Sequence, residues 1–358
     1  MRTDVHIRDG HDNNFTALRI GMAMAVLVGH AMIIAARDLQ AEPMVYGTYS
    51  LSYMAVNAFF VASGFLVTAS MVHRRSVRDF AVARILRIMP ALVVHVLLVM
   101  FVVGLWNTDL SAWSYLTHPD TLSQPLRVLT FVDTNFILPG VFTDNHERYA
   151  SAPLWTLRYE MLAYIGTALA FSVGALGSGK VIAAQFWATC VAWLAVAATG
   201  THDALPPTAL LLLRFALPYS LGAMVWAYRD QLPFRLWLVP VMCAAAVIGA
   251  DTVFGEIGMN LAVAYALFYL AYLPSATLAK LSSGPDVSYG VYIWHWPILQ
   301  WLAAKQPGME FAPMLLISVP LTVLVAWTSW HAVEKPALAR KTVVSDWLAT
   351  KRQRRATA

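Results

Sequence analysis

The residues best suited to chemistry in this sequence lie in its first apolar run, RIGMAMAVLVGHA, at residues 19 to 31. Arg19 stands at one end of the run and His30 near the other. Eleven residues make about three helical turns, so the two side chains project from nearly one face, about 16 Å apart along the axis. An ionisable residue so deep in an apolar helix faces a bundle interior or a wet cavity. The pair predicts a transmembrane path with an anion site at one mouth and a proton acceptor inside.

Each of these residues also has a simpler interpretation when it is taken alone. Arg19 fits a long side chain that reaches from the helix to the membrane interface. His30 fits a histidine that forms a hydrogen bond between two helices. Their shared face and their spacing are what favour the functional interpretation.

A second group of cations lies in the stretch RDFAVARILRIMP. Arg84 and Arg87 are three residues apart and therefore share one helical face. Guanidinium groups bind phosphate oxygens through paired hydrogen bonds, which predicts a phosphate site. The usual excess of cytoplasmic Lys and Arg is the alternative explanation. It accounts fully for Arg74, Arg75 and Arg78, but less well for two arginines in one stripe.

A carboxylate follows in the stretch APLWTLRYEMLAYI. Glu160 lies one to two turns beyond Trp155, which we place near the outer membrane interface. At that depth a carboxylate beside an imidazole would fix its tautomer and raise its basicity. A surface ion pair of Glu160 with Arg148 or Arg158 is the alternative.

The stretch SYGVYIWHWP carries another polar cluster. Ser288, Tyr292 and His295 lie along one side of the expected helix, with Tyr289 nearby. These side chains fit either a reaction site or hydrogen bonds between helices.

Composition requires that the elements holding these residues lie in a membrane. Of the 358 residues 59% are hydrophobic and 13% charged, which is too little polar surface for a water-soluble globule of this size. Runs of about twenty apolar residues span the hydrocarbon layer as helices. We therefore predict an all-α integral membrane bundle of ten transmembrane helices, near residues 17–36, 50–72, 82–105, 153–174, 181–199, 207–227, 234–251, 257–275, 287–304 and 313–332.

The basic residues predict the orientation of this bundle. With a cytoplasmic N-terminus, eighteen of the 25 lysines and arginines fall in inner segments and four in outer ones. Both termini are then cytoplasmic, and the first span is retained because no cleavage pattern follows it. The basic residues alternate with apolar runs, so the net charge of +5 indicates membrane flanks and not nucleic-acid binding. The long connection at about 106–152 is expected to be an extracytoplasmic cap with short helices.

Taken together, these segments resemble the acyltransferase 3 family of membrane acyltransferases, and the resemblance covers nearly the whole chain. The resemblance is to the stand-alone form of the family, which predicts a transmembrane domain over 1–340 and a basic cytoplasmic tail over 341–358. It is carried, in family order, by NNFTALRIGMAMAVLVGHA, VNAFFVASGFLVTAS, RILRIMP, LPGVFTDN, SAPLWTLRYEMLAYI, SLGAMVW, VSYGVYIWHWPI and EKPALAR.

The resemblance implies a ten-helix fold and a cytoplasmic acyl-CoA donor, usually acetyl-CoA, with no metal. It places the family's essential histidine on His30, its glutamate on Glu160, and its arginines on Arg19, Arg84 and Arg87. We predict His30 as general base, Glu160 as the residue that orients it, and the three arginines as ligands of the CoA phosphates. The candidates for contact with the acceptor or the oxyanion are Asn57, Trp155, Tyr164, Tyr289, Tyr292 and His295.

The sequence departs from the family pattern at three places, which leaves the acceptor open. Thr16 and Asn57 stand where many members have aspartate, and His295 with Trp296 fills a segment that varies between subgroups. We favour a sugar hydroxyl of exopolysaccharide or lipopolysaccharide, at the inner membrane. The reason is that the expected cap carries aromatic residues that either stack on sugars or pack the cap itself, namely Trp113, Tyr115, Phe131 and Phe136.

Two other classes of protein would use the same residues. A proton-coupled transporter of an anionic or acylated molecule would use His30 as a relay and Arg19 as an anion gate. A scaffold protein for a glycan synthase would need neither role. The sequence predicts membrane lipids as neighbours and leaves the oligomeric state open.

Overall fold

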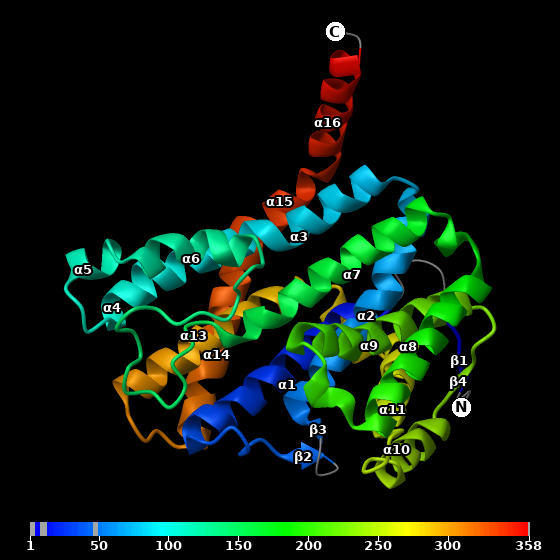
Figure 1. Ribbon diagram of the computed structural model, residues 1–358, viewed down its shortest axis with the longest axis horizontal. Coiled ribbons are helices and arrows are strands. Elements are labelled where there is room, and N and C mark those ends of the chain that lie inside the picture. Colours follow the sequence, from blue (N-terminus) through cyan, green and yellow to red (C-terminus); the bar gives the residue numbers. More distant parts are fainter. Residues whose placement is uncertain (1–3, 8–12, 46–48, 357–358) are drawn as a thin grey trace. The chain divides into compact units, whose positions relative to one another are not determined.

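The computed structural model describes residues 4–7, 13–45 and 49–356, and most of its regular structure is helical (Figure 1). The chain forms two compact units. Unit 1 comprises Met1–Gly29, Glu42–His73 and Tyr159–Asp286, and unit 2 comprises His30–Ala41, Arg74–Arg158 and Val287–Ala358. Helix α1 (Phe15–Ala36) begins in unit 1 and ends in unit 2.

Unit 1 is a group of apolar helices with two very short antiparallel sheets. Strand β1 (Asp4–Val5) pairs with β4 (Phe234–Arg235), and β2 (Met44–Val45) pairs with β3 (Tyr49–Ser50). Its helical elements are α2 (Leu51–Arg74), α7 (Trp155–Ser172), η3 (Ala175–Gly177), α8 (Gly179–Thr199), η4 (Thr201–Ala204), α9 (Pro207–Ala227), α10 (Leu238–Ile248), α11 (Gly255–Tyr272) and α12 (Ala276–Ser282). Residues 155–158 of α7 and Arg74 of α2 belong to unit 2.

Two glycines bring the backbones of α2 and α9 into contact in unit 1. A Cβ atom on Gly64 would lie 1.9 Å from the carbonyl oxygen of Tyr219, and one on Gly222 would lie 2.0 Å from that of Val61. No larger residue fits at either position without moving a helix. Close approach through small residues is how transmembrane helices gain packing energy where the hydrophobic effect is absent.

Unit 2 is built around α13 (Ser288–Lys305), whose residues from Ser288 to Gln300 are all buried. Helix α14 (Phe311–Ser329) packs along it, with Gly290 against Ala326. Helix α3 (Val77–Leu98) contacts α13 and η5. The remaining elements of unit 2 are η1 (Val99–Gly104), α4 (Leu105–Asn107), α5 (Ala112–Leu116), α6 (Pro119–Leu129), η2 (Ala152–Leu154), η5 (Trp330–Glu334), α15 (Lys335–Ala339) and α16 (Lys341–Ala356).

Every range predicted as a membrane span overlaps a helix, although the helices differ in length and hydropathy. The shortest is α10, with 11 residues, because Phe234–Arg235 at the start of the predicted range forms a strand instead. By length and composition, seven membrane crossings are supported when the bent pair of α11 and α12 counts as one. The other six are Phe15–Ala36, Leu51–Arg74, Val77–Asn107, Gly179–Thr199, Pro207–Ala227 and Phe311–Thr350.

The segment at 106–152 contains the short helices α5 and α6. Two of the aromatic residues proposed as sugar-stacking surfaces are buried there instead. Tyr115 is 0% exposed and donates its hydroxyl hydrogen to the carbonyl oxygen of Met100 at 2.7 Å, and Phe136 is 2% exposed. Burial raises the pKa of Tyr115. For these two residues the packing alternative is correct, whereas Trp113 is 78% exposed.

The predicted basic tail begins as helix α16, where the Ser345 hydroxyl donates a hydrogen bond to Asp79 at the start of α3. Residues 357–358 of this tail lie outside the described residues.

Candidate active site

His30 and His295 form a direct hydrogen bond in unit 2. His30 lies near the end of α1 and His295 in the middle of α13, and the distance from Nδ1 of His30 to Nε2 of His295 is 2.8 Å. His295 is fully buried, and the indole of Trp296 contacts the His30 ring edge-on. The sequence singled out both histidines, and the structure brings them together.

The hydrogen bonds assign the tautomers of this pair when both rings are neutral. The carbonyl oxygen of Val291 lies 3.0 Å from Nδ1 of His295, and a carbonyl can only accept, so His295 carries its proton on Nδ1. Its Nε2 is then an acceptor, and the hydrogen of the 2.8 Å bond belongs to Nδ1 of His30. This leaves the lone pair of His30 on Nε2. The chain from Val291 to His30 therefore orients an imidazole whose outer nitrogen is able to accept a proton.

A third imidazole lies close to this pair and was not predicted. His95 of α3 is fully buried, and its Nε2 is 2.9 Å from the hydroxyl oxygen of Ser151. Its ring contacts Trp294, next to His295 in sequence, and the imidazoles of His95 and His295 are near enough to interact electrostatically. In the described part of the chain, Nδ1 of His95 has no hydrogen-bond partner.

The spacing of His95 from the arginine pair was the signal that could have revealed it. His95 lies eleven residues after Arg84 on α3, the same interval as between Arg19 and His30. By helical rise the two side chains are about 16 Å apart on nearly one face. A single helix of unit 2 thus carries a basic end and an imidazole.

Arg84 and Arg87 form a basic cluster at the first half of α3. Arg87 pairs with the buried carboxylate of Glu334 at 3.6 Å and lies over the Trp330 ring. Arg84 stacks over Phe80, one turn earlier. Lys341, at the start of α16, is close enough to both arginines for mutual electrostatic repulsion. Three cations so close together form a concentration of positive charge suited to an anion.

Arg19 belongs to unit 1, where it forms an ion pair with Asp286 at 2.7 Å. Its side chain is 27% exposed. The ion pair fixes the guanidinium near the start of α1. That Arg19 acts together with Arg84 and Arg87 stays a prediction.

Glu160 accepts a hydrogen bond from the hydroxyl of Tyr164, one turn further along α7. The two candidate residues are thus partners, and they lie in unit 1. Arg158, proposed as an alternative partner of Glu160, donates to the backbone carbonyls of Phe131 and Val132. The described hydrogen-bond partner of His30 is an imidazole, so the pairing of Glu160 with His30 also stays a prediction. Trp155 is the first residue of α7.

The two tyrosines of α13 use their hydroxyl groups to fix neighbouring segments of unit 2. Tyr289 donates to the carbonyl oxygen of Ile88 at 3.2 Å. The hydroxyl of Tyr292 is 2.8 Å from that of Thr156 and 3.3 Å from the carbonyl oxygen of Pro153. These contacts position α13, and with it His295, against α3 and η2.

Asn57 lies in a buried polar cluster of unit 1 that the sequence did not predict. Its amide donates to the carboxylate of Glu256 at 3.0 Å, and Tyr53 and Asn260 donate to the same carboxylate at 2.8 and 2.9 Å. Arg214 donates to Asn57 and lies 3.6 Å above the Tyr53 ring. Ionisable residues inside apolar runs were the available signal.

No group of three or more His, Cys, Asp or Glu side chains that could hold a metal ion occurs in residues 4–7, 13–45 and 49–356. Cys190 and Cys243 are both free thiols. The pair of His30 and His295 described above is suited to proton transfer by an oriented imidazole.

Comparisons with known proteins show the family to which the chain belongs. A family model described as an acyltransferase domain matches residues 12–331. The chain is 28% identical over 339 residues to the O-acetyl transferase of Shigella phage Sf6, covering 92% of this chain and 96% of that protein. It is 28% identical over 369 residues to Nodulation protein 10 of Rhizobium leguminosarum bv. viciae, covering 93% and 95%. No solved structure gives a significant match. The chain therefore belongs to the acyltransferase family and is a multi-pass membrane acyltransferase.

Proposed function

We propose that this protein transfers an acetyl group from cytoplasmic acetyl-CoA to a hydroxyl group of an extracytoplasmic glycan, with His30 as the general base. The observation that carries the proposal is the hydrogen-bonded chain from Val291 through His295 to His30. A general base needs a lone pair that can accept a proton and a ring held in a fixed orientation, and this chain of hydrogen bonds supplies both. The name of the phage relative, an O-acetyl transferase, supports acetyl as the transferred group and oxygen as its acceptor.

The reaction needs one proton acceptor and one leaving group. Nε2 of His30 takes the proton of the acceptor hydroxyl while the oxygen attacks the thioester carbonyl carbon. The carbon–sulfur bond then breaks, and the CoA thiolate takes the proton back from the imidazolium. The products are an acetyl ester and free CoA, and the histidine returns to its starting state.

The donor site in this proposal is the basic cluster on α3. Arg84 and Arg87 would bind the phosphates of CoA, with Lys341 nearby, and Arg19 is a further proposed ligand. By helical rise, Arg84 and His95 are about 16 Å apart along α3, and an extended pantetheine arm can bridge that distance. The proposal thus places phosphate binding in the first half of α3 and proton transfer at His30 of α1.

We further propose that ten helices cross the inner membrane, with both termini in the cytoplasm. The excess of lysine and arginine in the inner segments supports this orientation, as does the helix present in each predicted range. In this topology the basic end of α3 faces the cytoplasm and the end of α1 faces outward.

Free-thiol release from acetyl-CoA by the purified protein in detergent tests the proposed activity. The transporter and scaffold hypotheses predict no release. We expect His30→Ala to reduce turnover at least 10²-fold with little change in CoA binding, because it removes the base alone. Arg84→Ala is expected to weaken CoA binding first.

His331→Gln is the matched control. His331 is an exposed histidine of unit 2, and its described hydrogen bond is to the backbone oxygen of Trp327. It should retain the activity of the unmodified protein. The opposite pattern, with CoA binding lost in His30→Ala and turnover lost at constant affinity in Arg84→Ala, would overturn the assignment of roles.

A further inference from the structure

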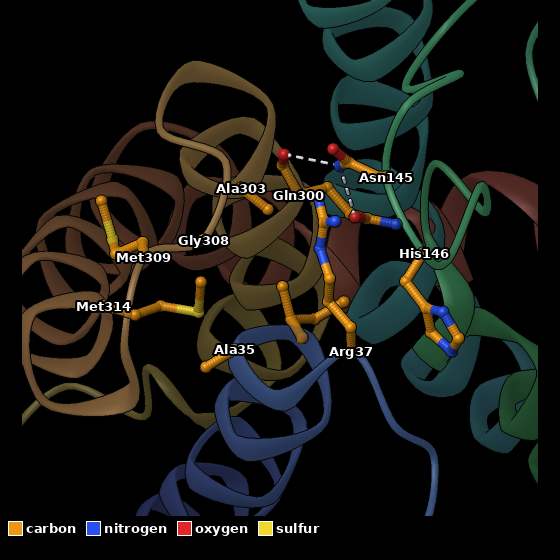
Figure 2. A pocket seen from close by; sticks show the side chains of 10 residues that line it. Ala35, Arg37, Asn145, His146, Gln300, Ala303, Gly308, Met309 and Met314 are labelled. Carbon is orange, nitrogen blue, oxygen red and sulfur yellow. Dashed lines mark hydrogen bonds between the residues drawn. The ribbon is translucent and has the colours of Figure 1, made fainter.

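A small cavity lies in unit 2 beside the ends of α1 and α13 (Figure 2). Its volume is about 10 Å³, which is space for one water-sized group. Arg37, Asn145, His146 and Gln300 supply its polar lining, and Met309 and Met314 lie on the other side. A site of this size binds one functional group of a ligand while the rest of the ligand stays outside.

The cavity is formed by the same two helices that hold the histidine pair. Arg37 follows His30 by seven residues, and Gln300 follows His295 by five. Arg37 follows the last residue of α1, so the position of the cavity along the helix is given by Ile34, which also lines it. Ile34 lies one turn after His30, about 6 Å further along α1. The cavity is therefore at the end of α1, beyond His30.

One wall of the cavity is fixed by hydrogen bonds. The Gln300 amide donates to the carbonyl oxygens of Glu147 and Tyr149, at 2.6 and 3.0 Å. Its side-chain oxygen and its backbone oxygen both accept from the Asn145 amide, at 2.8 and 3.0 Å. Gln300 is fully buried and Asn145 is 9% exposed. This wall is rigid, and its amide hydrogens are already used within the protein.

Arg37 is the permanently charged residue among those lining the cavity, and none of them is acidic. Its backbone has a φ of 55°, in the left-handed region that costs energy for any residue with a Cβ atom. Glycine or asparagine would end α1 there at lower cost. Figure 2 shows the Arg37 side chain extending toward the Asn145 and Gln300 pair. The turn that ends α1 thus directs a guanidinium group at the fixed wall.

We propose that Arg37 binds an acidic group of the acyl acceptor, a carboxylate or a phosphate, with one oxygen atom of that group in the cavity and the rest of it outside. The proposal rests on the proposed function, because that function brings an acceptor to His30. A guanidinium group binds either acid through charge-assisted hydrogen bonds. Because the cavity begins about 6 Å along α1 from His30, at Ile34, the acid and the acylated hydroxyl belong to different parts of the acceptor. The preferred acceptors are then acidic glycans.

Binding of three oligosaccharide probes to the full-length protein in detergent, without acyl-CoA, tests the proposal. One probe carries a uronic acid residue, one carries a phosphate group in its place, and one is neutral. We expect at least one acidic probe to bind tenfold or more tightly than the neutral one, as charge-assisted hydrogen bonds allow. Arg37→Met should abolish the preference, and Arg37→Lys should retain part of it. The two acidic probes together show which acid is preferred.

Lys305→Met is the matched control, because Lys305 ends the same helix α13 outside the cavity lining. It should leave the preference for acidic probes unchanged. Equal binding of all three probes, or a preference that survives Arg37→Met, would overturn the proposal. Because the assay contains no acyl donor, it stands apart from the thiol-release assay. Failure of the proposed activity therefore appears as absent CoA release, whatever the probes show.

Discussion

Unit 1 and unit 2 each bury a polar cluster, but the two clusters differ in whether a hydrogen-bonding group at the end is left available. In unit 1 both carboxylate oxygens of Glu256 accept hydrogen bonds, from Tyr53 on one side and from Asn57 and Asn260 on the other. In unit 2 the chain from Val291 to His30 ends on a nitrogen with a lone pair. A buried carboxylate with its hydrogen bonds made inside the protein joins α2 to α11, whereas an open-ended chain can exchange a proton with a substrate. We infer that the first cluster stabilises the fold and the second performs chemistry.

The largest effect is expected from Glu256→Ala. Removal of one member of a buried, charge-bearing network costs about 3–5 kcal/mol, because Arg214 loses its electrostatic interaction with the Glu256 carboxylate. The apparent melting temperature of the protein in detergent should fall markedly. Turnover per folded molecule should change less than twofold, because the cluster does no chemistry.

Addition of Arg214→Met to Glu256→Ala should recover part of the lost stability, because it removes the uncompensated charge. Glu310→Ala, at an exposed position before α14, serves as the control and should melt like the unmodified protein. Loss of turnover in a Glu256→Ala protein that remains folded would place unit 1 in the reaction and end the distinction between the clusters.

His295→Ala is expected to have a smaller effect, measured as free energy, than Glu256→Ala. The effect is on turnover and not on stability. Without the Nε2 acceptor, the His30 ring loses its tautomer and its orientation, and kcat should fall about 10²-fold. His295→Gln supplies a carbonyl oxygen that accepts from Nδ1 of His30 and should restore part of kcat. Steady-state kinetics with acetyl-CoA measure both variants, with KM for acetyl-CoA expected to be unchanged. Equal kcat values for the two variants would contradict an orienting role.

The smallest effect is expected from Ser151→Ala. It leaves the buried Nε2 of His95 without its partner, which costs about 1–3 kcal/mol of stability. The melting temperature should fall by several degrees and kcat by less than threefold. Loss of acyl transfer in Ser151→Ala, together with acyl groups found on Ser151 of the unmodified protein, would make His95 and Ser151 a second reactive site. The molecule would then have three polar clusters to compare.

Much of the helical framework followed from the sequence because about twenty apolar residues have few stable alternatives in a membrane. The prediction of 207–227 matches α9, and that of 17–36 matches α1 to within two residues. The strand at Phe234–Arg235 was not predictable, because its partner β1 is two residues long and carries no periodic pattern. The bounds of α10 were misjudged for this reason.

The sequence singled out His30 and His295 but did not predict that they pair. Helical periodicity shows which face of a helix is polar, and it does not show which other helix that face meets. Glu160 was chosen as the partner by its inferred depth, whereas the structure gives His30 an imidazole from α13. His95 was missed because a single histidine in an apolar run has no local signature, although its distance from Arg84 repeats the interval in α1.

The sequence distance between the two histidines has a consequence for biosynthesis. His30 is translated among the first residues of the chain, and the ring that orients it follows 265 residues later. A ribosome-bound chain that has inserted its early helices still lacks α13, so its first histidine has no fixed proton. On the proposed function, acyl transfer therefore begins only when synthesis of the chain is nearly finished, and a product truncated before α13 is expected to be inactive.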